Sequence, residues 1–370
     1  MDSLKADSLR FKHGTRLNAT ESTAGQYDFG DLLTYVIHHG AKKDSTHNRS
    51  GVTVIPNIAA NPTIGFQVGI KAVAGRRLGT DPATLFSVAA TSASITTKGI
   101  IYFYINHNIF TPGNKWNFQG NLVVAKTVSP DFGLGIGKSY DGDDPAQLIL
   151  ADNGRSVYPV HSVYYNIREK VYKHIRQRLF VGAGLSFEIR RNIQTNDSNG
   201  HSTPSGVYNT QHGFPQDHYS SNGFLFNIEY ITRDNPNRAY KGIYVDAGVR
   251  VNQTWIGSTK NALQFTTDFR KYVSLSAANP ETVLAVWNWG SYLLAGDIPY
   301  LELPGTARDG SFRSGRGYTA QYFKGTQFND TEMELRFPIL KNKFLSGVVF
   351  GSLQSGNDEH GTLFQVFQPG

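Results

Sequence analysis

Residues 179–190 read LFVGAGLSFEIR, a segment in which every odd-numbered position is apolar. This period of two is that of a β-strand whose two faces meet different surroundings. Strands in soluble proteins average about five or six residues, whereas a tilted strand needs about 9–11 residues to cross a bilayer. The apolar face consists of Leu179, Val181, Ala183, Leu185, Phe187 and Ile189, and the opposite face contains Gly182, Gly184, Ser186, Glu188 and Arg190.

The same alternation recurs along the chain from residue 51 to residue 353. It predicts about thirteen strands, of which the first two lie near 52–61 and 64–74. The clearest further examples are the segments 100–109, 115–125, 243–252 and 263–270. Long strands that repeat in this way indicate one large all-β domain.

The connections between these segments are of two kinds. Those at one end of the strands are compact and rich in turn residues, as at Thr111–Lys115 and Lys341–Lys343. The long ones, near 126–157, 191–219 and 294–330, all fall at the other end. Outer-membrane barrels have short periplasmic turns and long external loops, and a β-sandwich gives no reason for this division. The sequence therefore predicts a transmembrane antiparallel β-barrel, since a sheet in lipid must close to pair its backbone groups.

The composition excludes several other classes of protein. The 370 residues include no cysteine, which rules out a disulfide framework and thiol chemistry. The formal net charge is +7, but Lys and Arg are scattered rather than clustered, so we expect no nucleic-acid partner. No stretch approaches the roughly 18 consecutive apolar residues of a membrane helix, and residues 1–26 do not resemble a signal peptide.

Residues 1–50 are expected to form a polar N-terminal segment, and residues 51–370 the barrel. Apolar residues at helical spacing predict one short helix in the polar segment, from about Asp28 to Lys42. Two positions for this helix stay open. In one it rests at the periplasmic mouth or enters the lumen, and in the other it lies on the membrane surface as an amphipathic helix.

Aromatic residues near the ends of the predicted strands suit the girdles that flank the apolar band of a barrel. The alternative is that aromatic side chains simply favour strands. The residues concerned are Tyr102, Trp116, Tyr158, Tyr230, Tyr244, Tyr272, Trp287, Trp289 and Tyr292.

Four short motifs follow one another between residues 230 and 338. They are Arg233-Asp234-Asn235 after a strand, Asp268 and Arg270 within a strand, Arg316-Gly317-Tyr318 in the longest loop, and Glu334-Leu335-Arg336-Phe337-Pro338 on the strand after that loop. In this order they resemble the bacterial surface antigen family, which is the barrel of the BamA/TamA-type outer-membrane assembly and secretion superfamily. The likeness covers about 51–370 and is greatest to short members, common in Bacteroidota, that lack periplasmic POTRA repeats.

The resemblance implies a role for the Arg316-Gly317-Tyr318 motif. In the family, the arginine of this loop folds back into the lumen and pairs with inward-facing acidic residues. Here Glu332, Glu334 and Arg336 lie on the polar face of their strand, so Arg316 has partners available. A solvated turn on a surface loop is the alternative. Gly315 stands before Arg316, where the family usually has an apolar residue.

The resemblance also implies location and function. It places the chain in the bacterial outer membrane, where it would assemble, insert or translocate proteins, or lipids. Its partners would be outer-membrane lipids including lipopolysaccharide, and a protein substrate or an accessory periplasmic partner. The family barrel has sixteen strands and only about thirteen are expected here, so the chain is a fragment or another chain completes the barrel. The alternatives are a passive, porin-like channel and a structural surface protein.

We expect neither enzymatic activity nor a cofactor. No nucleophile elbow, phosphate-binding loop or zinc-protease motif occurs in the sequence. The pair His38-His39 and the acidic run Asp141–Asp144 are interpreted as solvated groups rather than metal ligands. A lumenal hydrolase built from His161, Asp246 and Asp268 is the weakest alternative, because nothing marks a nucleophile.

Overall fold

The computed structural model describes residues 52–61, 65–81, 83–136, 158–195, 203–235, 238–310, 312–340, 345–357 and 362–370. One antiparallel sheet of fourteen strands dominates it, and each strand pairs with the next along the chain. The strands are β1 (Val52–Asn61), β2 (Gly65–Arg77), β3 (Phe86–Thr96), β4 (Ile101–Phe110), β5 (Trp116–Asp131), β6 (Tyr158–Arg176), β7 (Leu179–Thr195), β8 (Tyr219–Ile231), β9 (Gly242–Asn252), β10 (Ala262–Ser274), β11 (Val283–Gly296), β12 (Gln327–Pro338), β13 (Ser346–Gly356) and β14 (Gln368–Pro369).

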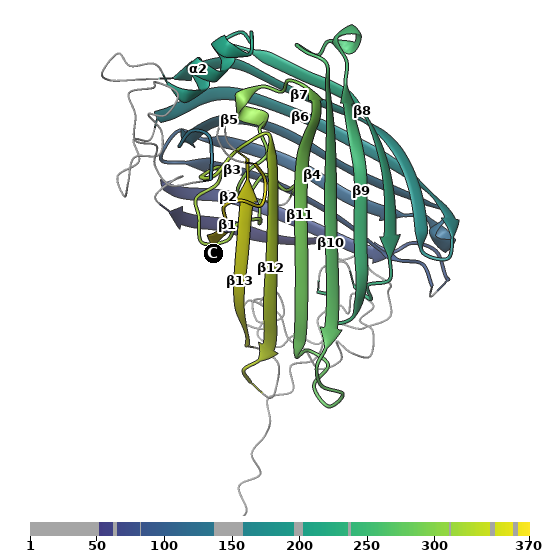
Figure 1. Ribbon diagram of the computed structural model, residues 1–370. Coiled ribbons are helices and arrows are strands. Elements are labelled where there is room, and N and C mark those ends of the chain that lie inside the picture. Colours follow the sequence, from purple (N-terminus) through teal and green to yellow (C-terminus); the bar gives the residue numbers. More distant parts are fainter. Residues whose placement is uncertain are drawn as a thin grey trace, which may run out of the picture.

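The sheet is strongly twisted and curved. In Figure 1 the strands from β1 to β7 cross the view at a steep angle to those from β8 to β13, so that the sheet wraps around an interior. Within the described residues it does not close: β1 pairs only with β2, and β13 pairs with β12 and the two-residue β14. The predicted all-β outer-membrane barrel class is confirmed, with thirteen long strands.

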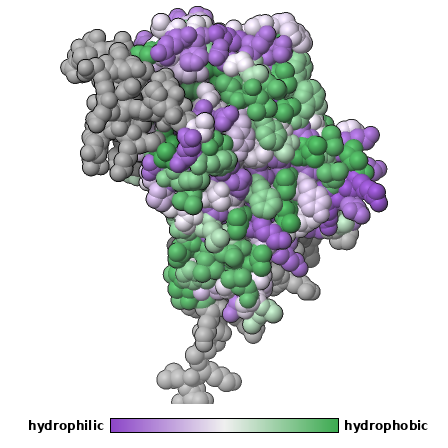
Figure 2. All heavy atoms as spheres, viewed as in Figure 1, coloured by the Kyte–Doolittle hydropathy of each residue, from purple (hydrophilic) through white to green (hydrophobic). Residues whose placement is uncertain are grey.

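Burial along the strands follows the predicted alternation, with apolar side chains outside and polar ones inside. On β7, Ser186 and Glu188 are 0% and 3% exposed, whereas Val181 and Leu185 are 44% and 43% exposed. A soluble protein would bury the apolar set instead. Figure 2 shows apolar side chains gathered over broad areas of the surface in this view. The outer face of the sheet is therefore suited to contact with lipid.

The two ends of the barrel differ as the connection lengths predict. Compact connections such as Gln177–Arg178, and the one that contains the 3-10 helix η2 (Pro112–Asn114), lie at one end. The other end carries the connections 132–157, 196–218 and 297–326. The second of these holds the helix α2 (Pro204–Gln211), and the third holds the 3-10 helix η5 (Tyr300–Glu302). Among the described residues, no helix is long and apolar enough to span a membrane.

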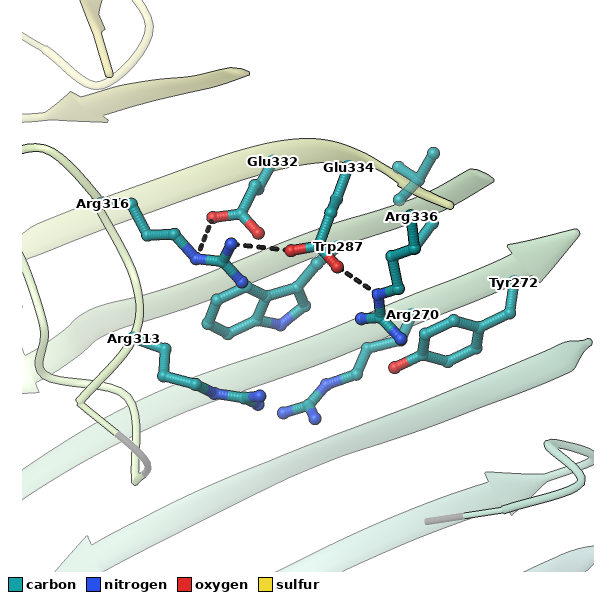
Figure 3. Close-up of a pocket in the computed structure, with 10 residues that line it drawn as sticks. Arg270, Tyr272, Trp287, Arg313, Arg316, Glu332, Glu334 and Arg336 are labelled. Atoms are coloured by element: carbon teal, nitrogen blue, oxygen red, sulfur yellow. Dashed lines mark hydrogen bonds and ion pairs between the residues drawn. The ribbon is translucent and has the colours of Figure 1, made fainter. Parts of the chain in front are cut away.

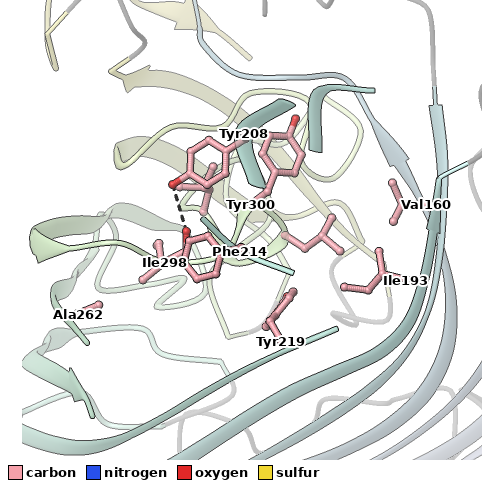
Figure 4. Close-up of a cluster of buried hydrophobic side chains, with 10 residues drawn as sticks. Val160, Ile193, Tyr208, Phe214, Tyr219, Ala262, Ile298 and Tyr300 are labelled. Carbon is pink, nitrogen blue, oxygen red and sulfur yellow. Dashed lines mark hydrogen bonds between the residues drawn. The ribbon is translucent and has the colours of Figure 1, made fainter. Parts of the chain in front are cut away.

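A cluster of buried hydrophobic side chains joins two of these long connections (Figure 4). Tyr208 of α2 donates a hydrogen bond from its hydroxyl to the carbonyl oxygen of Ile298, at 3.1 Å. The rings of Tyr208 and Tyr300 pack with their centroids 5.5 Å apart. The remaining members come from the adjoining loops and strand ends and are Val160, Ile193, Phe214, Tyr219, Ala262, Ile298, Leu301 and Leu303.

The predicted aromatic girdle is wrong for several of its residues. Tyr244, Trp287 and Trp289 are each 8% exposed and point to the interior, because they stand at inward positions of β9 and β11. In the interior the rings of Tyr244 and Trp287 pack against arginines, whereas Trp289 packs against Phe328. Trp116 and Tyr230 are 41% and 40% exposed. The predicted helix near 28–42, the pair His38-His39 and the run Asp141–Asp144 lie outside the described residues.

The outward position of Ile167, at the middle of β6, provides a test of the lipid-facing surface. Ile167 is 48% exposed, and Ile175, on the same face near the compact end, is 54% exposed. Ile167→Arg should lower the free energy of unfolding from lipid vesicles by about 2–4 kcal/mol, whereas Ile175→Arg should cost only about 0–1 kcal/mol. Denaturant titrations in vesicles would measure both, and equal costs would contradict the membrane placement of β6.

Candidate functional site

The long loop, residues 297–326 between β11 and β12, carries Arg316 into the barrel interior (Figure 3). Its Nη1 donates a hydrogen bond to Oε2 of Glu334 at 2.6 Å, and its Nε lies 3.1 Å from Oε2 of Glu332. The two glutamates alternate with the outward-facing Met333 on β12, so the period of the strand alone aims both at the interior. Their side chains are 3% and 7% exposed.

Glu334 bridges two guanidinium groups. Its Oε2 accepts from Arg316, and its Oε1 accepts from Nε of Arg336. Arg336 also lies over the ring of Tyr272, 5.5 Å from its centroid. Charge-assisted hydrogen bonds of this kind are about twice as strong as neutral ones and demand a fixed geometry. Removing Arg316 would leave Glu332 without this partner at a nearly dry position, which is costly.

Gly315 allows the loop to pass close to the wall. Its φ is +70°, and its backbone N–H donates to Oδ2 of Asp330 at 3.0 Å. A Cβ at this position would lie 2.3 Å from Oε1 of Gln354, an oxygen that accepts a hydrogen bond from Thr306 at 2.8 Å. The family that the sequence resembles usually has an apolar residue at this position. Such a side chain would not fit here, so the glycine at 315 has a local steric cause.

Tyr318 connects the motif to the last residues of the chain. Its hydroxyl donates to the carbonyl oxygen of Pro369 at 2.7 Å, and its ring packs against Phe323 with centroids 4.9 Å apart. Gly317, between Arg316 and Tyr318, has a φ of +95°. The turn of the chain at Gly317 thus sends Arg316 toward β12 and Tyr318 toward β14.

A second set of charges fastens the long loop to the opposite part of the wall. Arg308 of the loop lies 3.6 Å from Glu188 on β7. Glu302 of the loop lies 3.3 Å from Arg250 on β9, and Arg250 itself lies 3.6 Å from Glu188. The side chains of Glu188, Glu302 and Arg250 are all less than a tenth exposed. The long loop therefore crosses the interior between β12 and β7.

A third contact holds the loop at the end of β5. The hydroxyl of Tyr300 donates to Oδ1 of Asp131 at 2.5 Å, and the ammonium of Lys324 lies 3.8 Å from the same oxygen. Lys324 also sits over the ring of Tyr300, 4.1 Å from its centroid. Burial lowers the pKa of Lys324 to about 8, against the opposing influence of Asp131. Neither of these two further contacts can be predicted from the sequence, because their partners lie far apart in the chain.

The remaining motif residues fall in two places. At the compact connection between β8 and β9, Arg233 stacks 4.1 Å from the ring of Tyr244, and Asp234 accepts from the backbone N–H of Tyr240. Asn235 accepts from the backbone N–H of Arg238 in the same turn. On β10, Asp268 accepts hydrogen bonds from Arg270 and from Nε1 of Trp287. Arg270, Arg316, Glu332, Glu334 and Arg336 line one common pocket, to which the 233–235 turn does not contribute.

The structure does not assemble the residues considered for a lumenal hydrolase. Asp246 and Asp268 face each other across β9 and β10 on the inner face. His161 stands between the buried residues Val160 and Ser162 on β6, so it points to the other face. In the part of the chain that the structure describes, no three His, Cys, Asp or Glu residues are grouped as metal ligands would be.

Comparison with known proteins identifies the class of fold. A structure of BamA from Haemophilus ducreyi lacking POTRA domains 1–3 aligns with a TM-score of 0.51 and 14% sequence identity over 85% of this chain. CdiB from Acinetobacter baumannii gives a TM-score of 0.48 and 10% identity, with 85% of this chain and 51% of that one covered. No protein-family model matches the sequence, and no curated protein does.

The chain has the barrel fold of the BamA type, as the sequence motifs predict. It spans 58% of the length of the BamA structure that it matches. At 14% identity the likeness concerns the fold. What this chain does must therefore be argued from its own residues.

Gly315 provides a test of how tightly the long loop is seated. Gly315→Ala should lower the free energy of unfolding by about 1–3 kcal/mol more than Gly99→Ala, because only the first methyl group meets packed atoms. Gly99 is the matched control: its φ is +77°, and a Cβ there would meet nothing within 4 Å. Denaturant unfolding of both variants measures the difference. Equal losses would mean that the Gly315 region is not packed as described.

Proposed function

We propose that this chain works in the outer membrane of a Gram-negative bacterium as a non-enzymatic barrel that assembles, inserts or translocates proteins. The observation that carries the proposal is the long loop, which ion pairs and hydrogen bonds fasten to β12, β7 and β5 across the interior. A filtering pore needs an open aqueous path. A loop held by residues from both sides of the wall instead suits a barrel whose interior is occupied until a substrate displaces it.

The proposal assigns the incoming substrate to the edge of β1. Among the described residues, the edge of β1 that faces away from β2 has no strand partner. An unpaired edge presents backbone donors and acceptors that an incoming strand can use. The mechanism proposed is that Arg316 keeps the long loop in place until a substrate strand pairs with the wall. For lipids to use the same edge of the sheet, their acyl chains would have to stay in contact with its apolar outer face.

Three further partners belong to the proposal. The apolar outer face would contact outer-membrane lipids, with lipopolysaccharide in the outer leaflet. A protein substrate would enter at the sheet edge, and an accessory periplasmic protein would deliver it at the compact end. The basic residues exposed at that end, Lys173 and Arg176 of β6 among them, suit an acidic partner surface.

Single-channel conductance of the full-length protein in a planar bilayer tests whether the loop occludes the interior. The wild type should give a small, flickering conductance, and Arg316→Ala should give a larger one, because Glu332 and Glu334 lose the cation that holds the loop. Arg176→Ala, an exposed arginine at the compact end, should behave as the wild type. A large, steady conductance that is indifferent to Arg316 would favour the passive channel and contradict the proposal.

Site-specific crosslinking tests the assembly role directly. A photoreactive residue in place of Ile58 on β1 should capture an unfolded outer-membrane protein presented during its insertion into vesicles. The same residue in place of Ile167, which is flanked by strands on both sides, should capture much less. Both positions are exposed on strands, so lipid access alone cannot produce the difference. Equal crosslinking yields at the two positions would contradict the proposal that the substrate pairs with the edge of the sheet.

A further inference from the structure

Arginines outnumber the acidic residues that line the pocket beneath the long loop. Four arginines line it, namely Arg270, Arg313, Arg316 and Arg336. The carboxylates paired with them are Glu332, Glu334 and Asp268. Three of the four guanidinium groups, those of Arg270, Arg316 and Arg336, therefore have a carboxylate within ion-pair distance.

Arg313 is the fourth of these guanidinium groups. In the described part of the chain its guanidinium forms no ion pair, and it lies over Trp287 at 5.3 Å from the ring centroid. Asp309, on the same loop, is engaged elsewhere: its Oδ1 accepts from the backbone N–H groups of Arg313 and Ser314, at 2.6 and 2.7 Å. Arg313 is exposed to solvent, so a ligand can reach it.

Two guanidinium groups face each other in this pocket. Figure 3 shows Arg313 and Arg270 pointing toward one another beside Trp287, whose ring centroid lies 5.2 Å from Arg270. Arg270 uses Nε and Nη2 for Asp268, which leaves Nη1. Arg336 uses Nε for Glu334, which leaves both terminal nitrogens. An anion between the two guanidinium groups would reduce their repulsion, and their free N–H groups are donors suited to an oxyanion.

The size of the pocket limits the ligand. Its volume is about 30 Å³, and a water molecule needs roughly 10–15 Å³ on the same measure. The space therefore admits the oxygens of a small oxyanion but no sugar ring or acyl chain. Arg270 and Arg336 lie close to the ends of β10 and β12 that lead into compact connections, so the pocket belongs to the periplasmic half of the barrel.

We propose that this pocket binds the oxyanion of a phosphate or carboxylate group from the periplasmic side, between Arg313, Arg270 and Arg336. Arg316 is satisfied by Glu332 and Glu334 and only fixes the position of the loop. The ligand bridges the loop to β10 and β12, so its binding adds a contact that holds the loop down.

Calorimetric titration of the full-length protein in nonionic detergent at neutral pH tests the site, with inorganic phosphate and acetate as separate probes. The wild type should bind one anion, and Arg313→Gln should weaken binding about tenfold to a hundredfold, the usual range for losing charge-assisted hydrogen bonds. Arg176→Gln, with the same change in net charge at an exposed position, should bind as the wild type. Binding of phosphate alone identifies a phosphorylated ligand, and equal binding of acetate identifies a carboxylate group.

Arg313→Glu serves as a second variant that keeps the pocket filled. Its carboxylate would stand opposite Arg270 and take the place of the ligand, so anion binding should vanish while the circular dichroism spectrum is unchanged. The proposal is overturned if neither probe binds the wild type, or if Arg313→Gln binds as tightly as the wild type. These measurements involve no substrate and no conductance, so they fail or succeed independently of the assembly function.

Discussion

The pairing of backbone N–H and C=O groups within hydrocarbon is the constraint on which the rest of this molecule depends. An unpaired backbone group costs several kcal/mol in lipid, so a chain of this kind has to cross as hydrogen-bonded strands. Each of the thirteen long strands then presents one row of side chains to lipid and one to the interior. That division makes the interior polar and crowded with ionisable groups, and it supplies the surface to which the long loop is fastened.

The alternation of side chains allowed the fold to be predicted because it depends only on neighbours in the sequence. It placed β1 and β2 within a few residues and set Glu332 and Glu334 on one face. The contacts of the long loop with Glu188, Arg250 and Asp131 join positions more than fifty residues apart and leave no local pattern. The aromatic girdle was predicted wrongly for a related reason. The position of a residue near a strand end does not say which face its ring occupies, and the ring of Trp287 occupies the inner face.

Charged contacts hold the long loop to the wall in a way that apolar packing would not. A buried ion pair adds little net stability, because desolvation offsets most of the attraction, but its geometry specifies where each partner lies. Apolar packing enters at the end of the barrel opposite the compact connections, where Tyr208 and Tyr300 belong to the buried cluster, and also close to Arg316, where Phe323 of the loop is buried with Trp287 and Trp289. The part of the loop near Arg316 is therefore positioned by ion pairs together with the packing of Phe323, and the part near Tyr300 by hydrophobic burial together with its hydrogen bond to Asp131.

This difference determines how the loop can move. Displacing the segment held by Arg316 requires a replacement cation for Glu332 and Glu334, which a polar substrate strand can provide. Displacing the segment near Tyr300 would uncover the buried cluster and cost the associated hydrophobic free energy. The segment around Arg313 and Arg316, toward the compact connections, should thus release more readily than the segment near Tyr300, and the loop should pivot about the Tyr208–Tyr300 cluster. The distribution of ion pairs and apolar contacts along the loop therefore determines which of its parts can move.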